Sequence, residues 1–269
     1  MKNRKIYISA DMEGITSVIH WDETSGNNPD YQYFRKIMTN EVNAAIEGAL
    51  EQGATDIVVR DAHGSARNLI PDQLHENSQL IREWSKGPFA MLEGLDESFN
   101  AVCCVGYHAK AMTPDGTLAH TMNGSVFDLR VNNISLPELG WNALIAGYYN
   151  VPVIFVSGDR AICNQAEKLI PGIETVAVKQ GLGEASLNLH PKKSQQMIKK
   201  GVIRALEKSS EMKPLKYDPP FNIEVDFKKK EAANRAAWYP GTQRKGDFTV
   251  ILKCDDFLDC MRFFHLGFL

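Results

Sequence analysis

The sequence has no excess of charge of either sign and no long apolar run, and both absences narrow the class of protein. Its 269 residues include 30 Lys and Arg against 33 Asp and Glu, a formal net charge of −3 at pH 7. Binding to nucleic acid needs a basic face that this balance does not supply. No apolar stretch approaches the ~20 residues of a membrane helix. Because Asp11 and Glu13 interrupt the first apolar run, no export signal is expected either. We therefore expect a soluble cytoplasmic protein that binds neither nucleic acid nor membrane.

Cysteine is scarce, and the common nucleotide and serine-nucleophile motifs are absent. The five cysteines are an odd number without a Cys-x-x-Cys pair. The glycines form neither Gly-x-Gly-x-x-Gly nor a phosphate-binding loop, and Gly-x-Ser-x-Gly does not occur. These absences argue against a dinucleotide enzyme and a serine hydrolase. Unpaired cysteines usually behave as small core residues, so we expect buried free thiols at Cys103, Cys104, Cys163, Cys254 and Cys260.

Short apolar runs alternate with helical patterns along the first two thirds of the chain. Strands are expected over residues 5–10, 56–60, 100–106 and 151–157, and helices over residues 31–52 and 139–149. This alternation is typical of β-α-β units. It predicts an α/β fold with a mostly parallel sheet and helices on both faces.

The last third of the chain follows a different pattern. Residues 209–220 are rich in Lys and Pro and predict a connector, followed by strands over 221–227 and 248–252 and a helix over 255–264. We therefore divide the chain into a main α/β domain, residues 1–208, and a smaller C-terminal α+β lobe, residues 209–269. Within the main domain, Asn132-Asn133 predicts a tight hairpin, which would leave Glu138 on a loop.

Acidic and histidine side chains follow three successive predicted strands. In an open parallel sheet, residues at the carboxyl ends of the strands converge on one crevice. In extended backbone, Asp11 and Glu13 would point to the same side, since side-chain direction repeats every two residues. Each residue alone is a weak signal, because such an acid often caps a helix and a lone His is often without a role. The set that follows the strands is Asp11, Glu13, Asp61, His63 and His108.

Together with Glu138, the residues Asp11, Glu13, His63 and His108 offer three carboxylates and two imidazoles for a metal site. Carboxylates and imidazoles suit Zn²⁺, Mn²⁺ or Co²⁺, and the set is large enough for two ions. His120 differs from them because it lies in a loop with Gly and Thr neighbours, where it could reach the site from outside the sheet. That position suits proton transfer or nucleophilic attack, although a loop histidine judged alone is as often without a function.

Eight short motifs follow one another along the chain. They are Asp11-Met-Glu-Gly-Ile15, Met38-Thr-Asn-Glu41, Asp61-Ala-His63, Val105-Gly-Tyr-His-Ala109, His120-Thr-Met122, Glu138-Leu-Gly-Trp-Asn142, Ala146-Gly-Tyr-Tyr149 and Val176-Ala-Val-Lys-Gln180. In this order they resemble the binuclear-zinc D-aminopeptidase family. The resemblance implies that Asp11, Glu13, His63, His108 and Glu138 bind two Zn²⁺ per subunit, with Asp11 as the bridging ligand, and that His120 is the catalytic residue. It also implies a homodecamer of two rings around a channel that admits short peptides.

The leading hypothesis is a cytoplasmic metal-dependent aminopeptidase that removes an N-terminal, D-configured residue from short peptides. Two alternatives stay open: a binuclear amidohydrolase for another small amide, and a non-catalytic peptide- or metal-binding protein of the same fold. Residues 20–31, 157–160 and 181–184 depart from the family pattern, as does much of the C-terminal lobe. Because pocket contacts decide specificity, these departures bear on the substrate more than on the metal chemistry.

Overall fold

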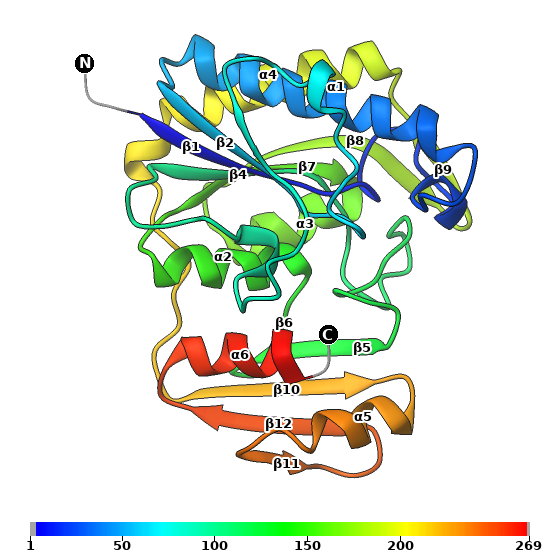
Figure 1. Ribbon diagram of the computed structural model, residues 1–269, viewed down its shortest axis with the longest axis vertical. Coiled ribbons are helices and arrows are strands. Elements are labelled where there is room, and N and C mark those ends of the chain that lie inside the picture. The colour runs from blue at the N-terminus through cyan, green and yellow to red at the C-terminus, as the bar shows by residue number, and fades with distance from the viewer. Residues whose placement is uncertain (1–3, 268–269) are drawn as a thin grey trace.

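The computed structural model describes residues 4–267, and its main feature is a seven-stranded sheet (Figure 1). The strand order is β3-β2-β1-β4-β7-β8-β9, and every neighbouring pair runs parallel except β8 and β9. Among residues 4–267, no helix is both long and apolar enough to cross a membrane. The strands are β1 (Lys5–Ala10), β2 (Asp56–Asp61), β3 (Gln79–Ile81), β4 (Ala101–Tyr107), β7 (Val153–Asp159), β8 (Glu174–Leu182) and β9 (Ala185–Asn188).

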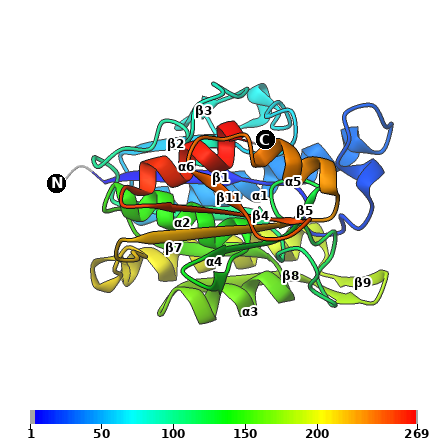
Figure 2. The same cartoon turned by 90° about the horizontal axis from the view of Figure 1, so that it is seen from below.

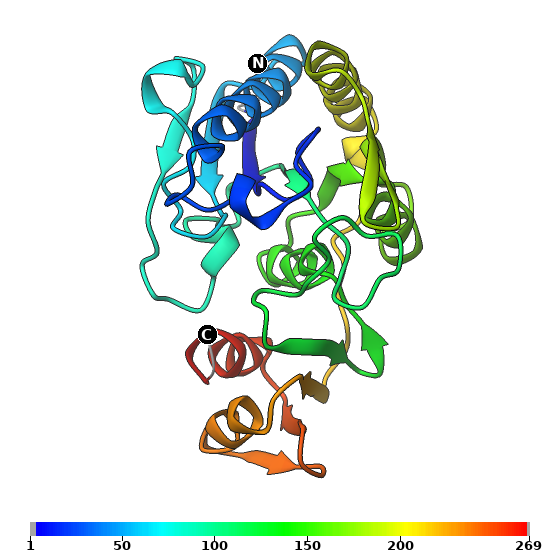
Figure 3. The same ribbon diagram turned by 90° about the vertical axis from the view of Figure 1, so that its right-hand side faces the viewer.

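Helices cover both faces of this sheet, which confirms the α/β class. On one face, α1 (Tyr31–Glu51) and α4 (Pro191–Glu207) pack against each other, and on the other lie α2 (Glu138–Tyr148) and α3 (Arg160–Leu169) (Figure 3). Every residue of β4 and β7 is buried, because these central strands are covered on both sides. The connection from β7 to α3 is fixed by Asp159, whose Oδ1 accepts a hydrogen bond from the backbone N–H of Ile162 at 2.7 Å.

A second, antiparallel sheet of order β11-β12-β10-β5-β6 lies below α2 in Figure 1 and is nearest to the viewer in Figure 2. Strand β10 alternates between buried and half-buried residues, as expected for a sheet with one packed face. The strands of this sheet are β5 (Val126–Val131), β6 (Ile134–Ser135), β10 (Phe221–Phe227), β11 (Thr242–Arg244) and β12 (Thr249–Cys254). The same part of the molecule contains the helices α5 (Lys230–Ala236) and α6 (Phe257–Gly267).

The predicted hairpin at Asn132-Asn133 is present, and both residues have positive φ, 50° and 65°. Its first strand, β5, pairs with β10 of the C-terminal lobe, and neither strand of the hairpin takes part in the main sheet. The lobe's sheet is therefore built from two distant parts of the chain. A domain boundary between residues 208 and 209 stays our proposal.

Two local expectations are wrong. Glu138 does not lie on a loop, because it is the first residue of α2 and follows Pro137, whose φ of −70° suits a helix start. Cys254 and Cys260 are not free thiols, because they form a disulfide between the end of β12 and the start of α6. The turn that joins these two elements brings the sulfurs together. Cys103, Cys104 and Cys163 are buried and free, as expected.

The turn after β1 passes unusually close to the end of β4. The backbone N–H of Gly14 donates to the carbonyl of Gly106 at 2.8 Å, and an added Cβ at Gly14 would lie 1.8 Å from the carbonyl oxygen of Tyr107. Only glycine allows this approach, because the obstacle is backbone that cannot rotate away. The contact fixes where the residues just before Gly14 are held relative to β4.

We expect Gly14→Ala to lower the free energy of unfolding by about 1–3 kcal/mol, since the turn must move to accept a methyl group. Gly124→Ala is the matched control, because an added Cβ there meets nothing within 4 Å. Urea unfolding in the presence of a chelator measures both without a contribution from bound metal. Equal stability of the two variants would contradict this account of the turn.

Candidate metal centre

Six polar side chains gather at the carboxyl edge of the main sheet. Asp11 and Glu13 follow β1, His63 follows β2 and His108 follows β4, whereas Glu138 begins α2 and His120 comes from the loop between β4 and β5. Five of the six line one cavity of about 510 Å³, and His108 lies buried beside them. The structure thus brings every candidate ligand and His120 into one place, as the positions at the strand ends predict.

Asp11, Glu13 and His63 form the first group of ligand atoms, all within 4.8 Å of one another. The Nδ1 atom of His63 lies 3.0 Å from Glu13 Oε2 and 3.3 Å from Asp11 Oδ1. Its Nε2 lies 3.0 Å from the carbonyl oxygen of Thr24, to which it can donate. A neutral His63 therefore turns the lone pair of Nδ1 toward the two carboxylates, as a metal ligand must. The backbone between Asp11 and Glu13 is a turn and not an extended strand.

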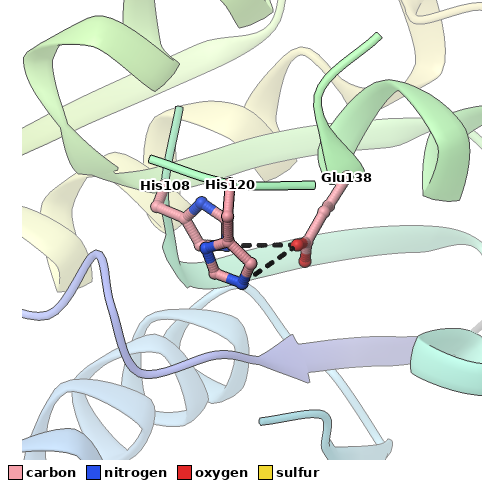
Figure 4. A group of neighbouring side chains, drawn as sticks. All are labelled: His108, His120 and Glu138. Atoms are coloured by element: carbon pink, nitrogen blue, oxygen red, sulfur yellow. Dashed lines mark ion pairs between the residues drawn. The ribbon is translucent and has the colours of Figure 1, made fainter. Parts of the chain in front are cut away.

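His108, His120 and Glu138 form the second group (Figure 4). Glu138 Oε1 lies 3.3 Å from Nε2 of His108 and 3.6 Å from Nε2 of His120. The two imidazole rings stack with their centroids 4.0 Å apart. Each Nδ1 faces a backbone carbonyl, that of Ala109 for His108 and that of Leu118 for His120. Both Nε2 atoms are thereby available to a metal or a proton.

Asp11 connects the two groups. Its Oδ1 faces His63, and its Oδ2 lies 3.5 Å from Nε2 of His108. Asp11 Oδ2 and His108 Nε2 are both buried and have no hydrogen-bond partner. Unpaired buried polar atoms are costly, and a cation between them would satisfy both. The donor set therefore fits metal ions, with Asp11 placed to bridge two of them.

Protonated imidazoles neutralise the buried carboxylates when no metal is bound. Burial, together with the charges of Glu13 and Glu138, raises the pKa of Asp11 to about 8. Burial is the largest effect on the pKa of Glu13 and acts to raise it, but the charge and hydrogen bond of His63, with the charges of His120 and His108, together hold that pKa well below its usual range. Burial is also the largest effect on the pKa of His108 and acts to lower it. The charge and hydrogen bond of Glu138, with the charges of Glu13 and Asp11, together overcome burial and raise the pKa of His108 to about 10. The metal-free site is a network of shared protons.

The pKa of His120 shifts in the opposite direction. Burial and the nearby positive charge of His108 lower it, so His120 is the imidazole of this site that is neutral near pH 7. Its Nε2 lies 3.8 Å from Glu13 Oε1 and 3.6 Å from Glu138 Oε1, between the two ligand groups. The ring of Trp21 meets it edge-on at 5.2 Å. A neutral imidazole in this position can accept a proton.

Asp61 is the one strand-end acid that the structure does not bring into the cavity. Its Oδ2 accepts hydrogen bonds from the backbone N–H groups of Asn68 and Leu69 at 2.6 and 2.7 Å. The side chain of Asn68 in turn donates to Asp61 Oδ1 and to the carbonyl of His63. Asp61 therefore fixes the loop that carries His63 and does not face substrate.

Lys179 also supports the site, although no role could be assigned to it from the sequence. This residue of β8 is 3% exposed, and its Nζ donates to the backbone carbonyls of Glu13 and Val18. Burial lowers its pKa to about 8. A lysine directly after the apolar run 176–178 was the available signal, since such a residue is rarely buried without partners. Lys179 fixes the backbone of the turn that carries Glu13.

Comparison with known proteins places the chain in a family. Residues 4–266 match the model of the D-aminopeptidase family, peptidase family M55. The chain is 37% identical over 259 residues to a D-aminopeptidase of Bacillus subtilis, covering 95% of this chain and 93% of that protein. Among solved structures it resembles the "Zn-dependent D-aminopeptidase DppA from Bacillus subtilis, a self-compartmentalizing protease", with a TM-score of 0.94, 35% identity, and coverage of 98% of this chain and 96% of the other. The chain therefore belongs to the M55 family of D-aminopeptidases.

Proposed function

We propose that this protein is a zinc-dependent aminopeptidase that releases an N-terminal D-residue from short peptides. The observation that carries the proposal is the pair of ligand groups that Asp11 connects at the wall of one cavity. Carboxylate and imidazole ligands suit Zn²⁺, and a shared carboxylate is typical of two-metal hydrolytic sites. A relative of 35% identity is described as Zn-dependent, which supports the same metal here.

In this proposal, Asp11, Glu13 and His63 hold one Zn²⁺, and Asp11, His108 and Glu138 hold the other. Bound zinc would polarise the scissile carbonyl and acidify a water molecule. The protein's own contribution is orientation. The backbone N–H of Met122 donates to Glu138 Oε1 at 2.6 Å, and the N–H of Met12 donates to Asp11 Oδ1 at 2.9 Å, so both carboxylates are held in place before a metal arrives.

His120 is the proposed catalytic residue. The five other side chains provide a sufficient ligand set, and the Nε2 of His120 faces the space between their carboxylates. A neutral imidazole there could take a proton from the attacking group and return it to the leaving amine. It could also attack the carbonyl itself, and the geometry favours neither role over the other.

A zinc-loaded activity screen tests the function. The protein should hydrolyse D-aminoacyl dipeptides and D-aminoacyl amides, and it should prefer them to the L-forms. Treatment with a chelator should abolish turnover, and added Zn²⁺ should restore it. Hydrolysis confined to amides that lack a free α-amino group would favour the alternative amidohydrolase. Binding without turnover across the whole panel would favour a non-catalytic protein of this fold.

His120→Ala should lower kcat by at least ~100-fold, because a positioned acid-base group contributes roughly 10²- to 10⁴-fold to the rate. Its zinc content and melting temperature should stay close to those of the wild type. His75→Ala serves as the control, since His75 lies outside the cavity. Loss of one zinc from the His120 variant would instead make this residue a ligand of the second group. A raised KM with unchanged kcat would make it a substrate-binding residue.

Zinc binding to the metal-free protein should saturate at two equivalents per chain and release on the order of three protons at pH 7. The raised pKa values of Asp11, His63 and His108 mean that these groups hold protons in the metal-free state. Zinc must displace those protons, so its affinity should fall as the pH falls from 8 to 6. Calorimetry in two buffers of different ionisation enthalpy measures the release. Saturation at one equivalent, or an affinity independent of pH, would exclude this account.

We also propose that the protein assembles into a closed particle, a homodecamer by resemblance, and acts in the cytoplasm. The structurally similar DppA is described as self-compartmentalizing, which supports assembly. Exposed apolar side chains, including Leu182 (57% exposed) and Leu187 (64%) on the β8–β9 hairpin, offer surface for such contacts. A sedimentation mass near that of the 30.1 kDa monomer at micromolar concentration, with zinc present, would exclude it.

A further inference from the structure

The wall of the cavity beyond the ligand groups includes two stretches that lie far apart in the sequence. Residues 84–87 form one, and α6 of the C-terminal lobe forms the other through His265 and Leu266. Neither part supplies a candidate metal ligand. Since the metal chemistry does not use these residues, they are available to bind the rest of the substrate.

Segment 84–87 is held firmly by the main sheet. Arg60 of β2 is fully buried, and its guanidinium donates to the carbonyl of Glu83 at 2.6 Å and to that of Ala90 at 3.2 Å. The same guanidinium lies over the ring of Trp84, 4.5 Å from its centroid. The indole N–H of Trp84 donates to the carbonyl of Gly64 at 2.7 Å, next to His63. The segment is thus fixed relative to the metal centre.

Lys86 is the only lysine or arginine that lines the cavity among the described residues. It is exposed, and it forms no ion pair or side-chain hydrogen bond with residues 4–267. The neighbouring Arg67 and Glu83 pair with each other outside the cavity. The ammonium group of Lys86 is therefore available to an anionic part of a ligand.

His265 provides a second donor with a fixed tautomer. Its Nε2 accepts a hydrogen bond from the indole N–H of Trp141 at 3.1 Å, so the proton of the neutral ring must be on Nδ1. Burial lowers the pKa of His265 to about 3, which keeps the ring neutral at working pH. No polar atom of residues 4–267 pairs with Nδ1, and His265 lines the cavity. The ring can only donate from Nδ1, which suits a carboxylate or carbonyl oxygen.

We propose that Lys86, with His265 as a second donor, binds the free C-terminal carboxylate of a short peptide. The inference rests on the proposed function and adds the substrate class, which is a dipeptide or tripeptide with a free carboxyl end. A cavity of about 510 Å³ falls within the ~300–1,000 Å³ of small-ligand sites and suits such a peptide. A peptide whose C-terminus is amidated loses the ion pair with Lys86.

The test compares D-alanylglycine with D-alanylglycinamide, which differ only in the carboxylate. Zinc-loaded wild type should have a kcat/KM about 10- to 100-fold higher for the free acid, the range expected for one charge-assisted hydrogen-bonded pair. Lys86→Gln should remove this preference by raising KM for the acid, with kcat/KM for the amide unchanged within about threefold. Lys86→Arg should keep most of the preference, because it keeps the charge. Lys36→Gln, an exposed lysine on α1 outside the cavity, should behave as the wild type.

Two variants at His265 distinguish the effect of losing its N–H donor from the effect of losing its ring. His265→Gln keeps a side-chain N–H and should lose less preference for the free acid than His265→Leu, with melting temperatures recorded to exclude unfolding. Equal kcat/KM for acid and amide in the wild type overturns the proposal and leaves the aminopeptidase function standing. The same holds if Lys86→Gln weakens both substrates alike. If the zinc-loaded wild type hydrolyses neither, the proposed function itself fails, and the subsite fails with it.

Discussion

Three carboxylates buried in one cavity are the constraint on which the rest of this site depends. Asp11, Glu13 and Glu138 are each at most 3% exposed, and like charges at this separation repel strongly where water is excluded. The arrangement persists only if positive charge is distributed among them. Imidazolium protons supply that charge in the metal-free protein, and metal ions can supply it more effectively, because they also pair with atoms that protons leave unsatisfied. Asp11 Oδ2 and His108 Nε2 are two such atoms, because both are buried and have no hydrogen-bond partner.

The parallel sheet is the feature that brings these ligand side chains together. Strands β2, β1 and β4 are neighbours in register, so the residues that follow them emerge side by side at one edge. The backbone behind the ligands is then fixed by contacts that the ligands do not make. Gly14 permits the close approach to β4, Lys179 holds the turn that carries Glu13, and Asp61 holds the loop that carries His63. Orientation is therefore established before any ion binds, which is what a metal centre of defined geometry needs.

The sequence could predict the parts of this arrangement that depend on local periodicity. The strand that ends before Asp11, and the strands that precede His63 and His108, follow from apolar runs and from the rule for strand ends. It could not predict that the 126–135 hairpin joins the C-terminal sheet, because the partner strand β10 lies some ninety residues away and pairing over such distances leaves no local signal. The same reason hid the support from Lys179, whose partners Glu13 and Val18 lie 166 and 161 residues away. The partners of Cys254 and Asp61 lie only six to eight residues away, but these contacts form only in the folded turn before α6 and the folded loop after β2. Glu138 was recognised as a ligand candidate although its local structure was not, since a helix begins there directly after Pro137.

The cavity has one part that holds the candidate metal ligands and another part that is proposed to bind the peptide, and different elements of the chain form the two parts. The ligands come from the edge of the main sheet and the start of α2, whereas Lys86 and His265 come from segment 84–87 and α6. Trp141 of α2 links the two parts, since its ring packs at 4.5 Å from Phe264 of α6 and its N–H sets the tautomer of His265. Substitutions in these two stretches of the wall can thus change which peptide binds without disturbing the charges that the metal site must balance.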